Sequence, residues 1–330
     1  MPGEGRNRSA GKQPWRLVRG LACSLALCSV ITAQVMLFDR GLQPGADTAP
    51  SLTVRLPAGS EGFIGDEFTV GEPGESWVID AVRTWAVQPP DRAAPTVALA
   101  DLFDKISLYG GLASDPPSKD EVVCGCHALP ALSRDGHVSA VSGAPESARP
   151  RGVWQVDFDS LRWSVPGGVR LQFGVEAEGR GGAHVWFNHV SATKAAHRLR
   201  VFGPTAMLES WLDEPASISV QVWGHLMARV KVETVAAGCR VTLFGQGAVD
   251  IHRIDVTSLR FGPAGVRPSS STLQASDDAG GPALVLTFPS VLNALPPGPV
   301  SLCLSGLRAD GVPFEGCDLV DATARPRPSQ

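Results

Sequence analysis

Apolar and polar residues alternate with a period of two along many short segments of this chain. The clearest example runs from residue 154 to 175, where two alternating stretches flank Pro166-Gly167. Successive side chains of a strand point to opposite faces, so this pattern predicts half-buried strands. A change of phase near Asp159-Ser160 indicates a bend. Pro-Gly favours a type II turn, so the two stretches after the bend are predicted to form a hairpin.

A second alternating segment runs from residue 77 to 87. One of its faces carries three large apolar residues together with Ala81 and Arg83; the three are Trp77, Ile79 and Trp85. This face is predicted to be buried, with Arg83 as its exception.

The remaining pattern predicts short strands throughout. The expected ranges are 63–70, 102–109, 184–189, 197–202, 218–222, 228–232, 240–244, 254–261, 284–288 and 300–304. The 36 Gly and 27 Pro favour turns and disfavour helix interiors. We therefore expect an all-β chain with two β-sandwich-like domains.

The predicted organisation has five parts. They are a signal segment at 1–33, an extended segment at 34–60, an N-terminal β domain at 61–212 with a loop insertion at 113–150, a C-terminal β-sandwich at 213–321, and a disordered tail at 322–330.

The N-terminus has the layout of a secretory signal. Five Lys or Arg precede an uninterrupted apolar or small stretch from Gly20 to Ala33. The clean apolar core is shorter than the roughly 20 residues that a membrane-spanning helix needs. We expect cleavage after Ala33 and an exported protein, extracellular or periplasmic; an uncleaved anchor is the alternative. No later segment is long and apolar enough to span a membrane.

The chain is acidic, with a formal net charge of −4. The first 33 residues carry five basic residues and one acidic residue, so cleavage would leave the remainder at −8. An acidic chain without a Lys/Arg cluster does not suit nucleic acid or an anionic membrane surface.

The cysteines suggest one disulfide and one open question. Cys303 and Cys317 stand symmetrically about the turn at Asp310, so they are predicted to form a disulfide across a hairpin. Cys124, Cys126 and His127 offer two thiolates and an imidazole to zinc. The favoured alternative is a bridge from Cys124 or Cys126 to Cys239, since zinc sites usually show Cys-x-x-Cys spacing.

Familiar catalytic motifs are absent, including the nucleophile elbow, the zinc-protease helix and phosphate-binding glycine loops. Asp157 and Asp159 would share one strand face, and glycosidases use a pair of carboxylates as catalytic residues. Alternation alone explains both residues as the solvent side of a strand, and that interpretation is favoured.

Aromatic residues give the one candidate ligand surface. Trp186 and Phe187 are adjacent, so in a strand one of them faces outward, and Trp211 follows in a short segment. An exposed aromatic ring is a platform for a sugar ring, although core packing is the commoner role of Trp.

The C-terminal unit resembles a small β module of secreted bacterial proteins. The resemblance covers residues 249–320 and rests on Ile254-Asp255, on Ser258-Leu259-Arg260-Phe261-Gly262-Pro263, on Leu284-Val285-Leu286-Thr287-Phe288, and on the hairpin from Leu304 to Cys317. In that family an Asp/Gly run that suits calcium precedes the Leu-rich strand. Here only Asp277 and Asp278 remain, which is too few for the six or more oxygens that calcium prefers.

The N-terminal unit is similar to the opening β domain of other exported bacterial proteins, through residues 66–70, the strand at Trp77 and residues 106–110. Both resemblances imply export and a β fold without assigning an activity. We therefore expect a non-catalytic exported protein with a binding or cell-surface structural role, whose partner is a glycan or a cell-surface protein. The alternative is an extracellular hydrolase acting on polysaccharide.

Overall fold

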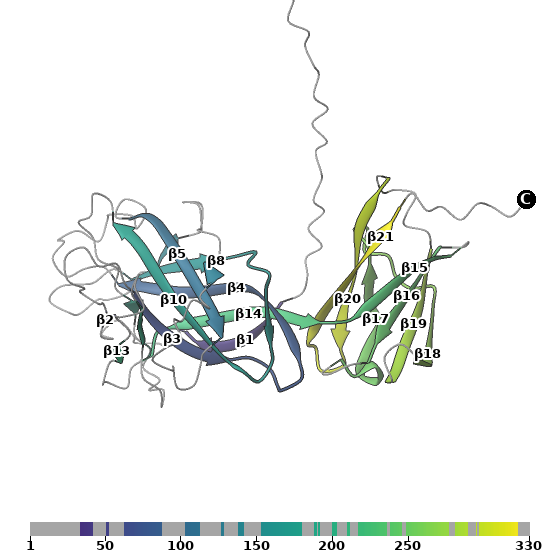
Figure 1. The fold of residues 1–330 in the computed structure, drawn as a ribbon, viewed down its shortest axis with the longest axis horizontal. Coiled ribbons are helices and arrows are strands. Elements are labelled where there is room, and N and C mark those ends of the chain that lie inside the picture. The colour runs from purple at the N-terminus through teal and green to yellow at the C-terminus, as the bar shows by residue number, and fades with distance from the viewer. Residues whose placement is uncertain are drawn as a thin grey trace, which may run out of the picture.

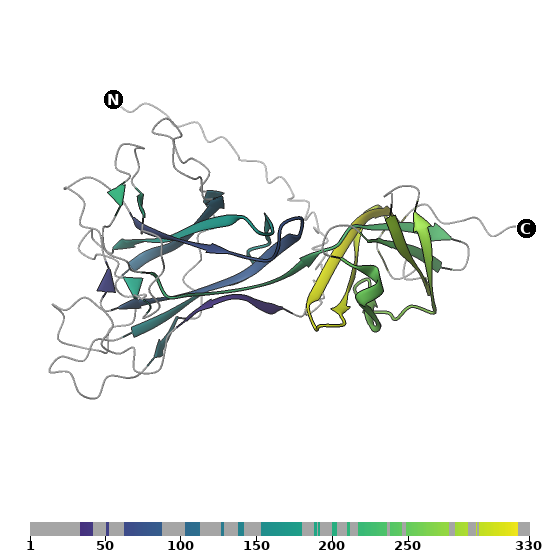
Figure 2. The same cartoon turned by 90° about the horizontal axis from the view of Figure 1, so that it is seen from below.

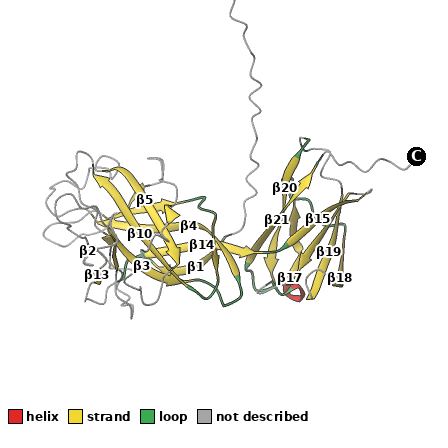
Figure 3. Ribbon diagram, in the orientation of Figure 1, coloured by secondary structure: helices red, strands yellow, loops and turns green. Residues whose placement is uncertain are grey.

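The computed structural model describes the parts of the chain that form its sheets. These are residues 34–41, 51–52, 63–87, 103–112, 127–128, 138–141, 153–179, 188–189, 191, 200–202, 210–211, 217–235, 238–245, 249–276, 281–289, 295 and 297–322. Nearly all of them are strand, and their one helical element is the short 3-10 helix Ile251–Arg253 (Figure 3). The all-β prediction is confirmed. No helix of the described residues has the length and apolar character needed to cross a membrane.

Two β units lie side by side and are joined through one long strand (Figure 1). The strands of the first unit are β1 (Val35–Arg40), β2 (Ser51–Leu52), β3 (Phe63–Thr69), β4 (Ser76–Val87), β5 (Phe103–Leu112), β6 (His127–Ala128), β7 (Val138–Val141), β8 (Val153–Phe158), β9 (Trp163–Pro166), β10 (Arg170–Gly179), β11 (Asn188–His189), β12 (Arg200–Phe202) and β13 (Ser210–Trp211). The joining strand and the strands after it are β14 (Val220–Met227), β15 (Val230–Val235), β16 (Gly238–Phe244), β17 (Ile254–Phe261), β18 (Ser270–Ser276), β19 (Gly281–Pro289), β20 (Pro299–Arg308) and β21 (Pro313–Asp321).

The first unit is a sandwich of two sheets. One sheet has the order β13-β12-β3-β10-β5-β6, and the other contains β4 with β8, β9, β11 and β14 as neighbours. Phe68 of β3 contacts Phe38 of β1 across the layers, at a centroid distance of 5.6 Å. Phe68 also packs on Phe173 of β10. Burial of these alternating apolar faces between two sheets is what stabilises such a fold.

β14 belongs to both units. Residues Val220–Leu226 pair with β4, and one end of β14 pairs with β1 along its other edge. Its last residues, Leu226 and Met227, pair in parallel with Phe314 and Glu315 of β21. The boundary expected at residue 213 places β14 in the second unit, whereas most of its pairing lies in the first.

The second unit is a smaller sandwich, seen from another side in Figure 2. Its sheets are β17-β20-β21 and β15-β16-β19-β18. Phe261 and Phe288 meet between the two sheets with ring centroids 4.7 Å apart, and both are completely buried. The core of this unit is therefore continuous from sheet to sheet.

One local prediction was wrong. β9 and β10 do not form a hairpin, because β9 pairs with β4 while β10 pairs with β3 and β5 in the opposite sheet. The predicted face of β4 is buried, with Arg83 as its partly exposed exception. β4 also contains a bulge that was not predicted: Asp80 has no counterpart on β14, and Val82 joins Trp77 in the core. A bulge of this kind shifts every later side chain by one face.

Candidate functional site

A groove of about 480 Å³ lies on the outer face of the sheet β15-β16-β19-β18. Ligand sites of proteins commonly fall between roughly 300 and 1,000 Å³. Most of its lining is polar: the residues are Lys231, Glu233, Arg240, Thr242, Phe244, Thr272, Gln274, Ala275, Ala283, Val285 and Thr287. We assign the candidate binding site to this groove.

The pairing of the four strands explains the hollow. One cross-strand row contains Lys231, Thr242, Val285 and Thr272. The next row on the same face places small Ala283 between Phe244 and Gln274. Short side chains on β19 therefore form a low floor, and longer ones on the flanking strands form the walls. Side chains of directly paired residues share a face, so the alternation within each strand places these polar side chains together on the outer face of the sheet.

The charges at one wall are nearly balanced. Nζ of Lys231 lies 3.3 Å from Oε1 of Glu233, and both side chains are well exposed. Arg240 pairs with Glu233 across the strands. An exposed ion pair contributes little to folding stability, so these groups can exchange their partners for a ligand at small cost. The groove offers donors and acceptors of both signs along one surface.

The two carboxylates considered for catalysis are not equivalent. Asp157 on β8 accepts a hydrogen bond from Nε of Arg83 and another from Nε2 of Gln155, at 2.5 and 2.8 Å. Arg83 also lies over the ring of Trp223, 5.1 Å from its centroid. Asp159 is exposed and lies beyond the end of β8, so the two carboxylates do not share a strand face. Asp157 is thus held in an ion pair, which gives the hydrolase alternative no support from this site.

The predicted aromatic platform falls largely outside the described residues. Trp186 and Phe187 lie there, and Trp211 is described only through its backbone, which pairs with Arg200 of β12. The platform therefore stays a prediction.

The predicted zinc ligands also lie largely outside the described residues. Cys124 and Cys126 lie outside the described residues, and His127 is described only through its pairing with Gly110. The alternative partner, Cys239, is fully buried in β16. The calcium candidates Asp277 and Asp278 also lie outside the described residues.

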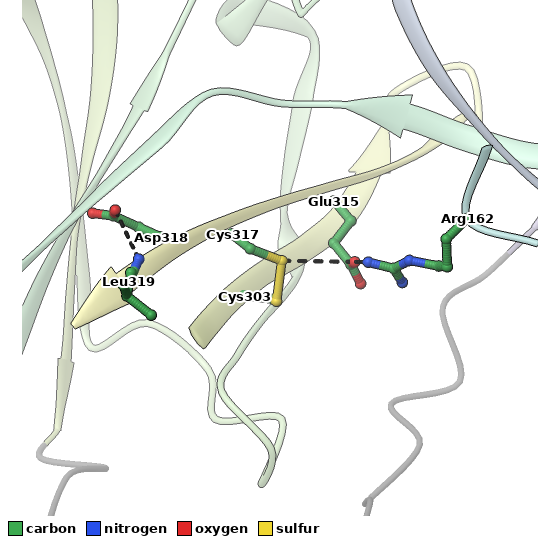
Figure 4. The surroundings of a disulfide bond; sticks show 6 residues. All are labelled: Arg162, Cys303, Glu315, Cys317, Asp318 and Leu319. Carbon is green, nitrogen blue, oxygen red and sulfur yellow. Dashed lines mark hydrogen bonds and ion pairs between the residues drawn. A yellow bond between two sulfur atoms is a disulfide. The ribbon is translucent and has the colours of Figure 1, made fainter. Parts of the chain in front are cut away.

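The predicted disulfide between Cys303 and Cys317 is confirmed, and its residues are directly paired across β20 and β21. Oε1 of Glu315 lies 3.8 Å from Sγ of Cys317 and 3.2 Å from Nη2 of Arg162 (Figure 4). A disulfide sulfur carries no proton, so the approach of Glu315 to Cys317 is a van der Waals contact and not a hydrogen bond. Cys303, Glu315 and Cys317 form a compact group of metal-ligating side chains. Because the sulfurs are bonded to each other, they offer no thiolate to a metal.

Figure 4 also shows how this region connects the two units, since Arg162 reaches Glu315 from the loop between β8 and β9. Ser160 and Arg162 adopt left-handed backbone conformations, with φ of 59° and 53°. This is the bend expected near Asp159. It is anchored where the N–H of the buried Leu161 donates to the carbonyl oxygen of Asp80, at 3.0 Å.

Sequence reasoning missed the groove because it missed β18. Ser270–Ser276 contains one large apolar residue, Leu273, and shows no alternation. The polar positions of β15 and β16 indicated a solvent face, but only strand pairing brings them beside Thr272 and Gln274.

Comparison with known proteins does not place the chain in a family. No family model matches, and no curated protein matches. Among solved structures, a lipase of Bacillus licheniformis in its propeptide form aligns at 11% identity with a TM-score of 0.15, over 81% of this chain and 42% of that one. At this TM-score the likeness supports no argument about fold or activity, and the chain spans less than half of that protein.

Proposed function

We propose that this chain is an exported, non-catalytic binding protein and that the groove on β15, β16, β18 and β19 binds a glycan. The observation that carries the proposal is the groove's lining: hydroxyl, amide, ammonium, guanidinium and carboxylate groups on one open, hollowed sheet face. Export rests on the basic and apolar N-terminal segment.

A glycan is favoured by the chemistry of the walls. Each sugar ring presents several hydroxyl groups that both donate and accept hydrogen bonds, as Gln274 and the threonines do. A strongly anionic ligand is disfavoured because Glu233 lies between Lys231 and Arg240 in the lining. The open shape also leaves room for a chain to continue beyond the groove.

The test is a glycan-array measurement on residues 34–330, which contain every strand that the structure describes. Arg240→Ala and Gln274→Ala should each weaken binding by roughly threefold to tenfold, because one ligand hydrogen bond contributes about 0.5–1.5 kcal/mol. Asp159→Ala, at an exposed residue of the first unit, is the control and should bind normally.

Two results would contradict the proposal. One is the absence of binding to any glycan. The other is binding that survives both groove substitutions and is lost in Trp186→Ala, which would place the site on the predicted aromatic platform instead.

A further inference from the structure

β18 is an edge strand without the usual protection. It pairs with β19 in unbroken register from Ser270 to Ser276, and no strand among the described residues pairs with its other edge. Natural edge strands are commonly blunted by charges, proline, bulges or short length. The seven residues of β18 contain no charge and no proline. Residues 271–275 are all exposed.

The centre of this edge is apolar. Leu273 pairs with the buried Leu284, so its side chain lies on the core side of the sheet, yet 48% of Leu273 is exposed. The sandwich core is therefore open at the position where a further strand would be added. A neighbour that brings another apolar side chain to this point would bury Leu273.

The sequence around β18 favours an identical strand as that neighbour. Arg267 stands before β18, and Asp277 and Asp278 follow it. Two copies of the strand paired antiparallel bring the basic end of each beside the acidic end of the other. A two-fold axis makes such an interface self-complementary.

We propose that a second copy of this chain pairs with the first through β18, antiparallel and centred on Leu273. In this register Leu273 of each copy lies directly opposite the other, and Thr272 lies opposite Gln274. Directly opposite residues share a face, so the two leucines extend the core side. The two four-stranded sheets become one continuous sheet.

A consequence for ligand binding rests on the proposed function. Thr272 and Gln274 line the groove at its β18 wall. Pairing through β18 joins the groove of one copy to that of the other, so the dimer presents one longer groove that suits a linear polymer. Self-association itself is measured without glycan, so failure of either proposal is recognised separately.

The first test is the molar mass of residues 34–330 by light scattering over a range of protein concentrations. The expected result is a concentration-dependent dimer. Leu273→Lys places like charges directly opposite each other and removes the apolar contact, so the dissociation constant of the dimer should rise at least roughly tenfold. Leu319→Lys is the matched control, because Leu319 is 70% exposed on β21 and should leave the dimer intact.

The second test examines the register. Thr272→Lys with Gln274→Lys should abolish the dimer, since each lysine then faces another. Thr272→Lys with Gln274→Glu pairs opposite charges and should retain it. A wild-type protein that is monomeric at every concentration would overturn the proposal. So would a dimer that Leu273→Lys leaves unchanged, or one that both double variants affect equally.

Discussion

His225 and Asp80 form a buried pair at the point where β4 bulges: Nδ1 of His225 lies 2.6 Å from Oδ2 of Asp80. Their side chains are 1% and 6% exposed. Asp80 is the residue of β4 that has no counterpart on β14, and His225 lies on β14 close to the junction with the second unit. The bulge therefore turns a polar side chain towards a partner that regular pairing would not supply.

Removing the carboxylate of this pair should destabilise the protein. Asp80→Ala leaves a buried ring nitrogen of His225 without that partner, which costs about 1–3 kcal/mol. The measurement is the midpoint of urea unfolding. Asp159→Ala is the control, because Asp159 is exposed and its removal should change stability by no more than about 0.5 kcal/mol. Equal effects of the two substitutions would contradict the assigned role.

A second buried pair connects β1 to the first unit. Removing one of its partners should destabilise the protein more than Asp80→Ala does. Nη2 of Arg40 lies 2.7 Å from Oδ2 of Asp66, and the same oxygen accepts from the backbone N–H of Ile218 at 2.6 Å. Burial lowers the pKa of the Arg40 guanidinium from its ordinary value, while the charge of Asp66 opposes that shift. Asp66→Ala should cost roughly 3–5 kcal/mol, because it leaves a buried cation without its counter-ion.

A double variant that removes both charges tests whether the ion pair itself is the cause. Arg40→Met together with Asp66→Leu removes both charges and should recover much of the stability lost in Asp66→Ala, since apolar replacement of a buried pair is often tolerated. Urea unfolding of Arg40→Met, of Asp66→Leu and of the double variant gives the coupling energy between the two side chains. A double variant that is no more stable than Asp66→Ala would show that the hydrogen bonds to Ile218 and Glu67, not the charge, dominate.

The turn of the β20–β21 hairpin should show a defined pH dependence. The side-chain hydrogen bond from Arg308 is the main cause that lowers the pKa of Asp310 to about 2. Desolvation opposes it, while the backbone N–H of Val312 and the positive charges of Arg308 and Arg253 lower the pKa further. A folded-state pKa below the unfolded value means that the unfolded chain binds the proton more readily. The stabilisation is therefore complete above about pH 4 and is lost as the pH falls towards 2.

The matching measurement compares wild type with Asp310→Asn in urea at a series of pH values. The wild type should be more stable between pH 5 and 7, by less than about 1 kcal/mol because the side chain is partly exposed. The difference should shrink as the pH falls below about 4 and disappear only below about pH 2. A difference that stays constant over this range would mean that charge is not the cause.

The disulfide should stabilise the folded protein by closing a loop and so restricting the unfolded chain. Cys303 and Cys317 are separated by 14 positions, and a loop of about this length gives roughly 3 kcal/mol in the chain-entropy account. The variant with both cysteines changed to Ser should unfold at lower temperature by calorimetry. Wild type in reductant should match it, whereas the variant itself should be insensitive to reductant.

The sequence determined the parts of this structure that depend on neighbours along the chain. Alternation of apolar residues established most of the longer strands and the all-β class, and the Ala309-Asp310-Gly311 turn established the hairpin that pairs Cys303 with Cys317. These features depend on side-chain period and turn chemistry, which are local properties.

Only the tertiary structure decided which strands are partners. β9 and β10 look like a hairpin by sequence, yet they lie in opposite sheets. One residue, Asp80, reverses the faces of β4, and the uncharged, weakly apolar β18 becomes the wall of a groove. Pairing between distant strands depends on packing of whole faces, so the period of a single segment cannot specify it.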